Sequence, residues 1–130
     1  MSESSHTAAV TTALSTGGAV PHDLDKVPGS TGNPGTLPPY YTEVSVMRRF
    51  GGNPRVTTQS GVQGYRITTR AVANSAANAR NMRSKQHAAL EETVLVVDGE
   101  ATTPIKFDSA EPIAEDEGMY SGLTTWTYAH

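Results

Sequence analysis

The passage from residue 62 to residue 92 most constrains the fold of this 130-residue chain, because its hydrophobic pattern changes there from a strand period to a helix period. Residues 62–73 alternate, and the side chains that would share one face of a strand are Tyr65, Ile67, Thr69 and Ala71. Residues 75–92 are rich in good helix formers, and Asn74 or Ser75 can cap the helix. A strand followed directly by a long helix predicts that the helix packs back onto a sheet.

The predicted helix carries a buried face and a polar stripe. Many members of the buried face are alanine, which allows close packing on a sheet; the face comprises Ala79, Met82, Gln86, Ala89 and Leu90. The polar stripe has spacings of three and four residues and comprises Arg80, Arg83, His87 and Glu91. The simplest prediction for His87 is an interaction with Glu91.

The other predicted elements are a short amphipathic helix at 4–15 and strands at 40–50, 93–97, 101–107 and 120–128. Asp98-Gly99 is a strong hairpin signal, and Pro104 indicates an edge strand or a bulge. This order predicts an α+β fold with a mostly antiparallel sheet of about five strands and two helices packed on one face. We expect one domain over residues 1–130.

Two segments are predicted to be loops. Residues 21–39 contain five of the eight prolines and three glycines, which predicts an extended arm. Either a short strand lies around 24–27, or a partner orders the arm; simple flexibility is the alternative. The candidate contact residues of the arm are Pro34, Leu37, Pro38, Pro39 and Tyr40. Residues 108–118 are predicted to form an acidic loop.

Charge is sorted along the chain. Residues 44–85 contain eight basic and no acidic residues, whereas residues 86–130 contain nine acids and one base, although the formal net charge is only -3. Oppositely charged patches on one chain permit head-to-tail assembly of identical copies. The candidate basic residues, for an interface between subunits or for contact with DNA phosphates, are Arg48, Arg49, Arg66, Arg70, Arg80 and Arg83. The candidate complementary acids are Glu111, Glu115, Asp116 and Glu117.

Two other interpretations of these charges stay open. Ordinary surface arginines could pair with the acidic segment of the same chain. A nucleic-acid-binding domain could use the arginines on phosphates without reading sequence, although no aromatic platform is interleaved with them and no helix-turn-helix is recognisable.

The sequence offers little for catalysis or metal binding. The chain has no cysteine, which excludes a disulfide framework and a cysteine-ligated metal. Its four histidines do not form a metal-binding helix pair, and residues 115–117 lack the EF-hand spacing. We therefore predict no catalytic residue, no metal and no cofactor, and keep a small enzyme only as an alternative. No apolar run approaches 18 residues and the first residues are not of signal-peptide type, so we expect no membrane association.

The order of the predicted elements and their residue patterns resemble those of the tail terminator proteins of long-tailed, siphovirus-type bacteriophages. The resemblance extends over most of the chain and is carried by Leu-Pro-Pro-Tyr-Tyr-Thr-Glu-Val-Ser-Val at 37–46, Gly-Tyr-Arg-Ile-Thr-Thr-Arg-Ala-Val-Ala at 64–73, Ala-Arg-Asn-Met-Arg at 79–83 and Thr-Thr-Trp-Thr-Tyr at 124–128. The chain departs from the family pattern in its basic strand pair and in its Gly/Pro-rich loop at 28–39.

The resemblance implies a structural virion protein without catalytic residues. Such a protein forms a homo-hexameric ring, caps the tail tube, ends its polymerisation and offers a joining surface to the head-side connector or stopper protein. DNA would pass through the ring without sequence recognition. The implied place is the neck end of the virion tail, after assembly in the host cytoplasm. A neck or head-closure connector protein is the alternative within the same biology.

Overall fold

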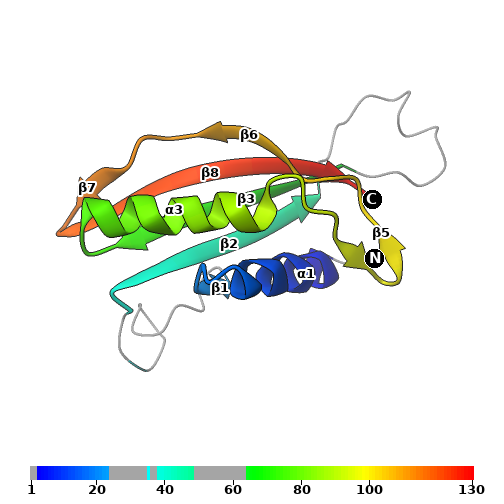
Figure 1. Ribbon diagram of the computed structural model, residues 1–130, viewed down its shortest axis with the longest axis horizontal. Coiled ribbons are helices and arrows are strands. Elements are labelled where there is room, and N and C mark those ends of the chain that lie inside the picture. Colours follow the sequence, from blue (N-terminus) through cyan, green and yellow to red (C-terminus); the bar gives the residue numbers. More distant parts are fainter. Residues whose placement is uncertain (1–2, 24–34, 36–37, 49–63) are drawn as a thin grey trace.

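A mixed, mostly antiparallel sheet forms the centre of the molecule (Figure 1). The computed structural model describes residues 3–23, 35, 38–48 and 64–130. Along the sheet the order is β1-β2-β3-β8-β6, and β7 also pairs with β8. The strands are β1 (Pro21–Asp23), β2 (Tyr40–Arg48), β3 (Gly64–Ala73), β6 (Lys106–Ala110), β7 (Ala114–Asp116) and β8 (Met119–Ala129).

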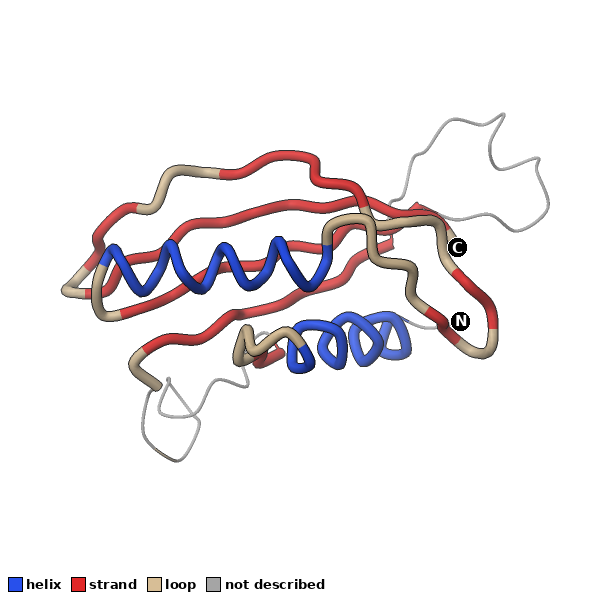
Figure 2. Tube along the Cα trace, viewed as in Figure 1, coloured by secondary structure: helices blue, strands red, loops and turns tan. Residues whose placement is uncertain are grey.

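Two helices, α1 (Glu3–Thr16) and α3 (Ala76–Leu90), cover the same face of this sheet (Figure 2). The α3 residues that are buried are four of the five predicted, namely Ala79, Met82, Gln86 and Leu90, and Ala89 packs half-buried beside them. The Ser75 side chain accepts a hydrogen bond from the Asn78 backbone N–H at 3.2 Å, which confirms it as the helix cap. The predicted α+β architecture with helices on one face is therefore confirmed, with six strands in the main sheet rather than about five.

The core lies between the helices and the three long strands. In β3 the predicted inward face is buried, and Ile67 pairs with Val46 of β2 and Trp126 of β8. Helix α1 contributes Val10 and Leu14, both fully buried. Period-two burial in β8 continues to the end of the strand, because the residues at even positions 122–128 face the helices.

A buried polar network ties α3 to the sheet. The Gln86 side chain is fully buried; its Nε2 donates to Thr42 Oγ1 at 2.9 Å and its Oε1 accepts from Thr69 Oγ1 at 3.1 Å. Trp126 Nε1 in turn donates to Thr69 Oγ1 at 3.3 Å. One helix residue is thus joined to β2 and β3, and through Thr69 to β8.

The predicted hairpin is confirmed. Strands β4 (Val96–Val97) and β5 (Glu100–Ala101) form a separate antiparallel pair. Both turn residues have positive φ, 52° at Asp98 and 83° at Gly99, as the tight turn between two twisted strands requires. The predicted return strand at 101–107 is wrong as one element, because it is divided between β5 and β6 with Pro104 between them.

The predicted acidic loop at 108–118 is also wrong. Its first residues complete β6, residues 114–116 form β7, and both strands pair with β8. Only the connections are irregular, including a turn in which Glu117 and Gly118 have positive φ. Pairing with the long strand β8 satisfies backbone groups that the sequence left without an obvious partner.

The predicted arm at 21–39 is only partly described. Its first three residues form β1, which lies parallel to β2 at the edge of the sheet and begins with a proline, where a strand tolerates one. Pro38 and Pro39 precede β2 without regular structure. The possible strand at 24–27 and the candidate contact residues Pro34 and Leu37 lie outside the described residues.

Candidate assembly surfaces

The histidines serve structural roles where the structure shows their contacts. His6 is fully buried, stacks on Tyr65 with ring centroids 3.8 Å apart, and has Nδ1 2.7 Å from the Tyr128 hydroxyl oxygen. Burial lowers the pKa of His6, so the neutral ring is favoured. Burial also favours the neutral form of Tyr128, and therefore raises the pKa of its hydroxyl. Within the described residues, no group of His, Asp and Glu side chains is arranged to hold a metal ion.

His87 does not adopt the predicted interaction with Glu91. Its ring lies against two aromatic side chains instead, 4.8 Å from the Trp126 ring and 5.4 Å from the Phe107 ring between centroids. Within the described residues, no ion pair joins the side chains of His87 and Glu91. The polar stripe of α3 therefore carries an aromatic contact at His87.

Arg66 and Arg70 lie on the face of β3 that points away from the helices, side by side as predicted. The Arg70 side chain is 45% exposed and its Nε is 4.0 Å from Glu43 Oε1 on β2. This surface ion pair contributes at most about 1 kcal/mol. Arg48 is half-buried at the end of β2, and Arg49 lies outside the described residues.

Arg83 is held by the acidic segment of its own chain, but through main-chain atoms. Its Nη2 donates to the carbonyl oxygens of Glu111 at 2.6 Å and Leu123 at 3.4 Å. Burial lowers the pKa of Arg83, whereas the charge of Glu111 raises it. Gly122 makes the contact possible, because a Cβ there would overlap the Arg83 guanidinium. Arg83 is thus bound within its own chain by main-chain carbonyls, and within the described residues it forms no ion pair with an acidic side chain.

A groove of about 650 Å³ lies beside Arg83, between α3 and the connection from β6 to β7. One wall is basic and polar, and the other is apolar. Its lining residues, none of them acidic, are Arg80, Arg83, Ser84, His87, Pro112 and Ile113. The Nε of Arg83 is buried and has no hydrogen-bond partner within the described structure.

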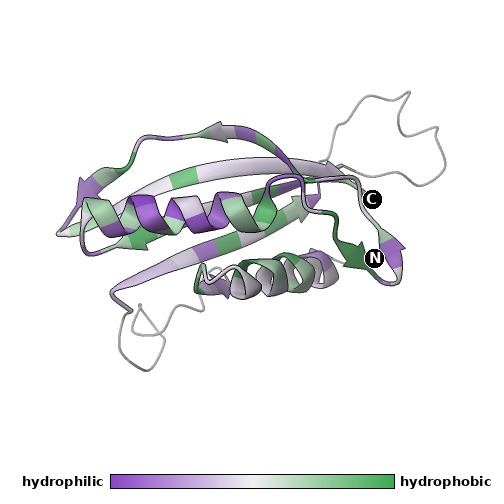
Figure 3. Cartoon of the chain, viewed as in Figure 1, coloured by the Kyte–Doolittle hydropathy of each residue, from purple (hydrophilic) through white to green (hydrophobic). Residues whose placement is uncertain are grey.

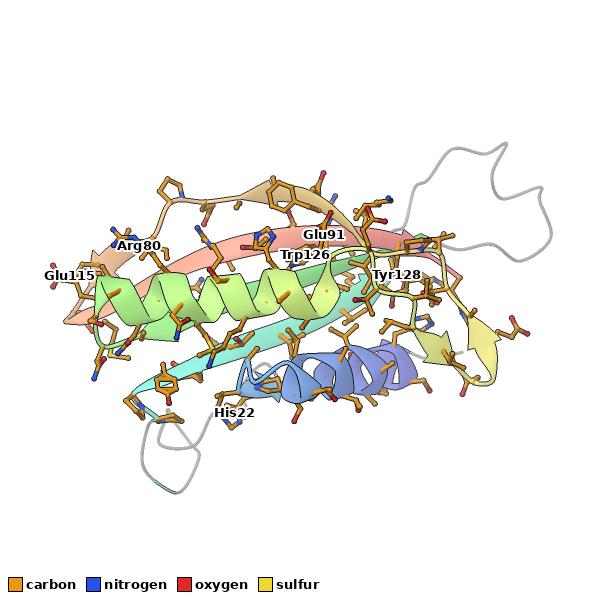
Figure 4. The ribbon with its side chains drawn as sticks, in the orientation of Figure 1. His22, Arg80, Glu91, Glu115, Trp126 and Tyr128 are labelled. Atoms are coloured by element: carbon orange, nitrogen blue, oxygen red, sulfur yellow. The ribbon has the colours of Figure 1, made fainter. Side chains whose placement is uncertain are left out.

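The candidate acids gather at one edge of the sheet. All four (Glu111, Glu115, Asp116 and Glu117) are exposed, on β7 and the segments that flank it. Figure 4 shows Glu115 and Arg80 at the same end of the molecule. At this end the basic and acidic sequence blocks are neighbours in space and do not form two separate surfaces.

Several large apolar side chains are exposed, and the sequence analysis did not identify them as a surface. Val96 is 66% exposed and Val94 49%, both on the hairpin segment, and Phe107 is 43% exposed on β6. Met47 of β2 and Tyr40, a candidate arm residue, are exposed as well. The signal was present in the sequence, since alternation over 93–97 places Val94 and Val96 opposite the buried Leu95 and Val97.

Comparisons with known proteins identify relatives of the fold only. No protein-family model and no curated protein matches the chain. Among solved structures, a chain from the virion of a native gene transfer agent particle is similar, with a TM-score of 0.69 and 17% sequence identity over 95% of this chain and 92% of that chain. A second solved structure, named only by a sequence code, has a TM-score of 0.66 and 15% identity over 99% and 95% of the two chains. The fold is shared over essentially the whole length of each.

The described part of the chain contains no helix that is long and apolar enough to cross a membrane.

Proposed function

We propose that this chain is a structural protein of a phage-like virion. The observation that carries the proposal is the similarity of fold, over nearly the full length of both chains, to a chain from the virion of a gene transfer agent particle. A match that covers more than nine-tenths of each chain relates the two as whole domains. The exposed apolar side chains on the hairpin and on β6 also favour a protein that assembles with others.

Within the virion, we propose the role of tail terminator. The chain would form a homo-hexameric ring at the neck end of the tail, cap the tube, end its polymerisation and offer a surface to the head-side connector. The support is the resemblance of the β3-to-α3 passage and of the closing strand to that family, together with a fold that matches the resemblance.

The proposal also assigns a role to the outward arginines of β3. Arg66 and Arg70 would face either the DNA in the lumen or a neighbouring subunit. Because phosphate contacts hold DNA without reading its sequence, two arginines on an open sheet face suit a passing duplex. The double change Arg66→Glu and Arg70→Glu separates the two roles. Normal tails with impaired DNA delivery indicate the lumen, whereas rings that fail to assemble indicate an interface.

The function is tested by deleting the gene from the genome that encodes the particle. The particles that assemble without the protein are then imaged by electron microscopy. Overlong or polydisperse tails are expected, because an uncapped tube continues to polymerise. Tails of normal length that are not joined to heads would move the protein to the neck as a connector. Intact, infectious particles would refute both roles.

A further inference from the structure

The outer side of the β4–β5 hairpin is apolar where a surface strand normally carries polar residues. Leu95 and Val97 point into the core with 5% and 2% exposure, so Val94 and Val96 point outward. Figure 3 shows β4 among the most hydrophobic segments of the chain. An outward pair of β-branched residues exposes apolar area without stabilising the monomer.

The hairpin is nevertheless held firmly in this position. The Leu95 backbone N–H donates to Thr102 Oγ1 at 3.0 Å, and the Thr102 backbone N–H donates to the Leu95 carbonyl at 2.8 Å. Thr103 exchanges two hydrogen bonds with Ala129 at the end of β8. A pre-organised apolar surface loses little conformational entropy when a partner binds it.

The groove beside α3 is complementary to this hairpin. Its Pro112 and Ile113 wall is apolar, and Arg80 and Arg83 supply positive charge. The hairpin presents valines beside a turn that carries two exposed acids, Asp98 and Glu100. Apolar side chains can therefore meet the apolar wall while the acidic turn approaches the arginines.

The hairpin of one chain lies too far away to occupy the groove of the same chain. Figure 1 shows β5 beyond the C-terminal end of α3, and Figure 4 shows Arg80 toward its N-terminal end. The ten helical steps from Arg80 to Leu90 alone span about 15 Å. A contact between these surfaces therefore joins two copies through different patches, and this head-to-tail arrangement closes into a ring where the rotation between copies allows it.

We propose that the β4–β5 hairpin of one copy docks into the α3 groove of the next copy. The inference rests on the proposed ring and deepens it, because it names the surfaces by which subunits meet. Val96 enters the groove against Ile113, and Glu100 lies near Arg80. The acids on β7 stay outside the groove and flank the contact.

Cross-linking tests this contact cleanly, because the chain has no cysteine of its own. The variant with Val96→Cys and Ile113→Cys is treated with a short bis-maleimide, both as purified protein and in assembled tails. A ladder of covalent oligomers is expected, since each copy then has one cysteine on each side of the contact. Each single variant is expected to give no ladder. A matched control joins Val96→Cys with Ser15→Cys, at an exposed position near the end of α1, and is also expected to give none.

A charge swap gives a second, independent readout. Arg80→Glu is expected to weaken subunit association at least about tenfold, and adding Glu100→Arg is expected to restore it. Absence of the ladder from both preparations, with the cysteines shown to react, would overturn the docking arrangement. The tail lengths in the deletion experiment would still decide the function. Conversely, a ladder from a protein whose deletion leaves tails unaltered would support the contact and refute the terminator role.

Discussion

Replacing Gln86 by leucine is expected to destabilise the fold by about 2 kcal/mol. Gln86 is fully buried and its amide satisfies two threonine hydroxyls. Leucine leaves Thr42 without its donor, and an orphaned buried polar group costs roughly 1–3 kcal/mol. Thr69 loses less, because its hydroxyl is also 3.4 Å from the Thr124 carbonyl and can still donate there. Leucine has no amide to bury, which offsets part of this cost.

The change can be measured by thermal and urea unfolding, followed by circular dichroism and by the fluorescence of Trp126, the only tryptophan. An unfolding entropy of about 2.1 cal/mol/K per residue predicts a shift of about 4 °C per kcal/mol in a chain of this length, so Tm should fall by about 8 °C. As a matched control, Ala88→Leu on the exposed side of α3 is expected to change stability by less than about 0.5 kcal/mol.

A double-mutant cycle tests the cause of the effect. Thr42→Val alone strands the Gln86 amide, whereas Thr42→Val with Gln86→Leu removes both partners of the bond. The double variant should therefore be less destabilised than the sum of the single variants, with a coupling of about 1 kcal/mol or more. Additivity within about 0.5 kcal/mol would refute the argument that an unpaired hydroxyl causes the loss.

Three other changes test other parts of the fold. Because burial lowers the pKa of His6, the unfolded chain binds more protons than the folded chain as pH falls below about 6.5, and the free energy of unfolding should decrease there by up to about 1.4 kcal/mol per pH unit. The variant His6→Phe should reduce this slope, measured by urea unfolding between about pH 5 and 7.5. Gly122→Ala should cost about 1–3 kcal/mol by displacing the Arg83 guanidinium, and its cost should shrink in an Arg83→Ala background. Gly99→Ala should lower Tm by about 4 °C, since the space around its Cβ is open and only the positive φ opposes it.

Local patterns were sufficient to predict the strand-to-helix passage. Alternation in β3 and the small face of α3 are properties of neighbouring residues, and the capping residue Ser75 lies directly between the two elements. Gln86 was correctly placed on the buried face. Its partners were not predictable, because Thr69 and Thr42 are 17 and 44 residues away and hydroxyl groups carry no signal of pairing.

Strand pairing between residues far apart in the sequence explains the wrong predictions at 101–107 and 108–118. Glu115 and Asp116 have low strand propensity, yet they form β7 because β8 is long enough to pair with β6 along one part and β7 along another. The sequence could not indicate this edge, since strand propensity depends on the neighbouring strand. Phe107 illustrates the same limit, because its contact with His87 depends on which strand lies beside α3.

The charge pattern of the sequence does not predict the charge pattern of the surface, because basic and acidic residues that are separated along the chain can lie side by side in the fold. Arg83 donates two hydrogen bonds from Nη2, to the carbonyls of Glu111 and Leu123, and so anchors the β6–β7 edge to α3. Arg66 and Arg70, from the same block, lie on the opposite face of the sheet. Among the described arginines of β3 and α3, one group therefore lies beside the groove and the other on the outward face of β3. In the proposed ring, salt would weaken the charged part of the subunit contact, at Arg80, and leave its apolar packing largely unchanged. The outward arginines would govern salt-sensitive contacts with DNA.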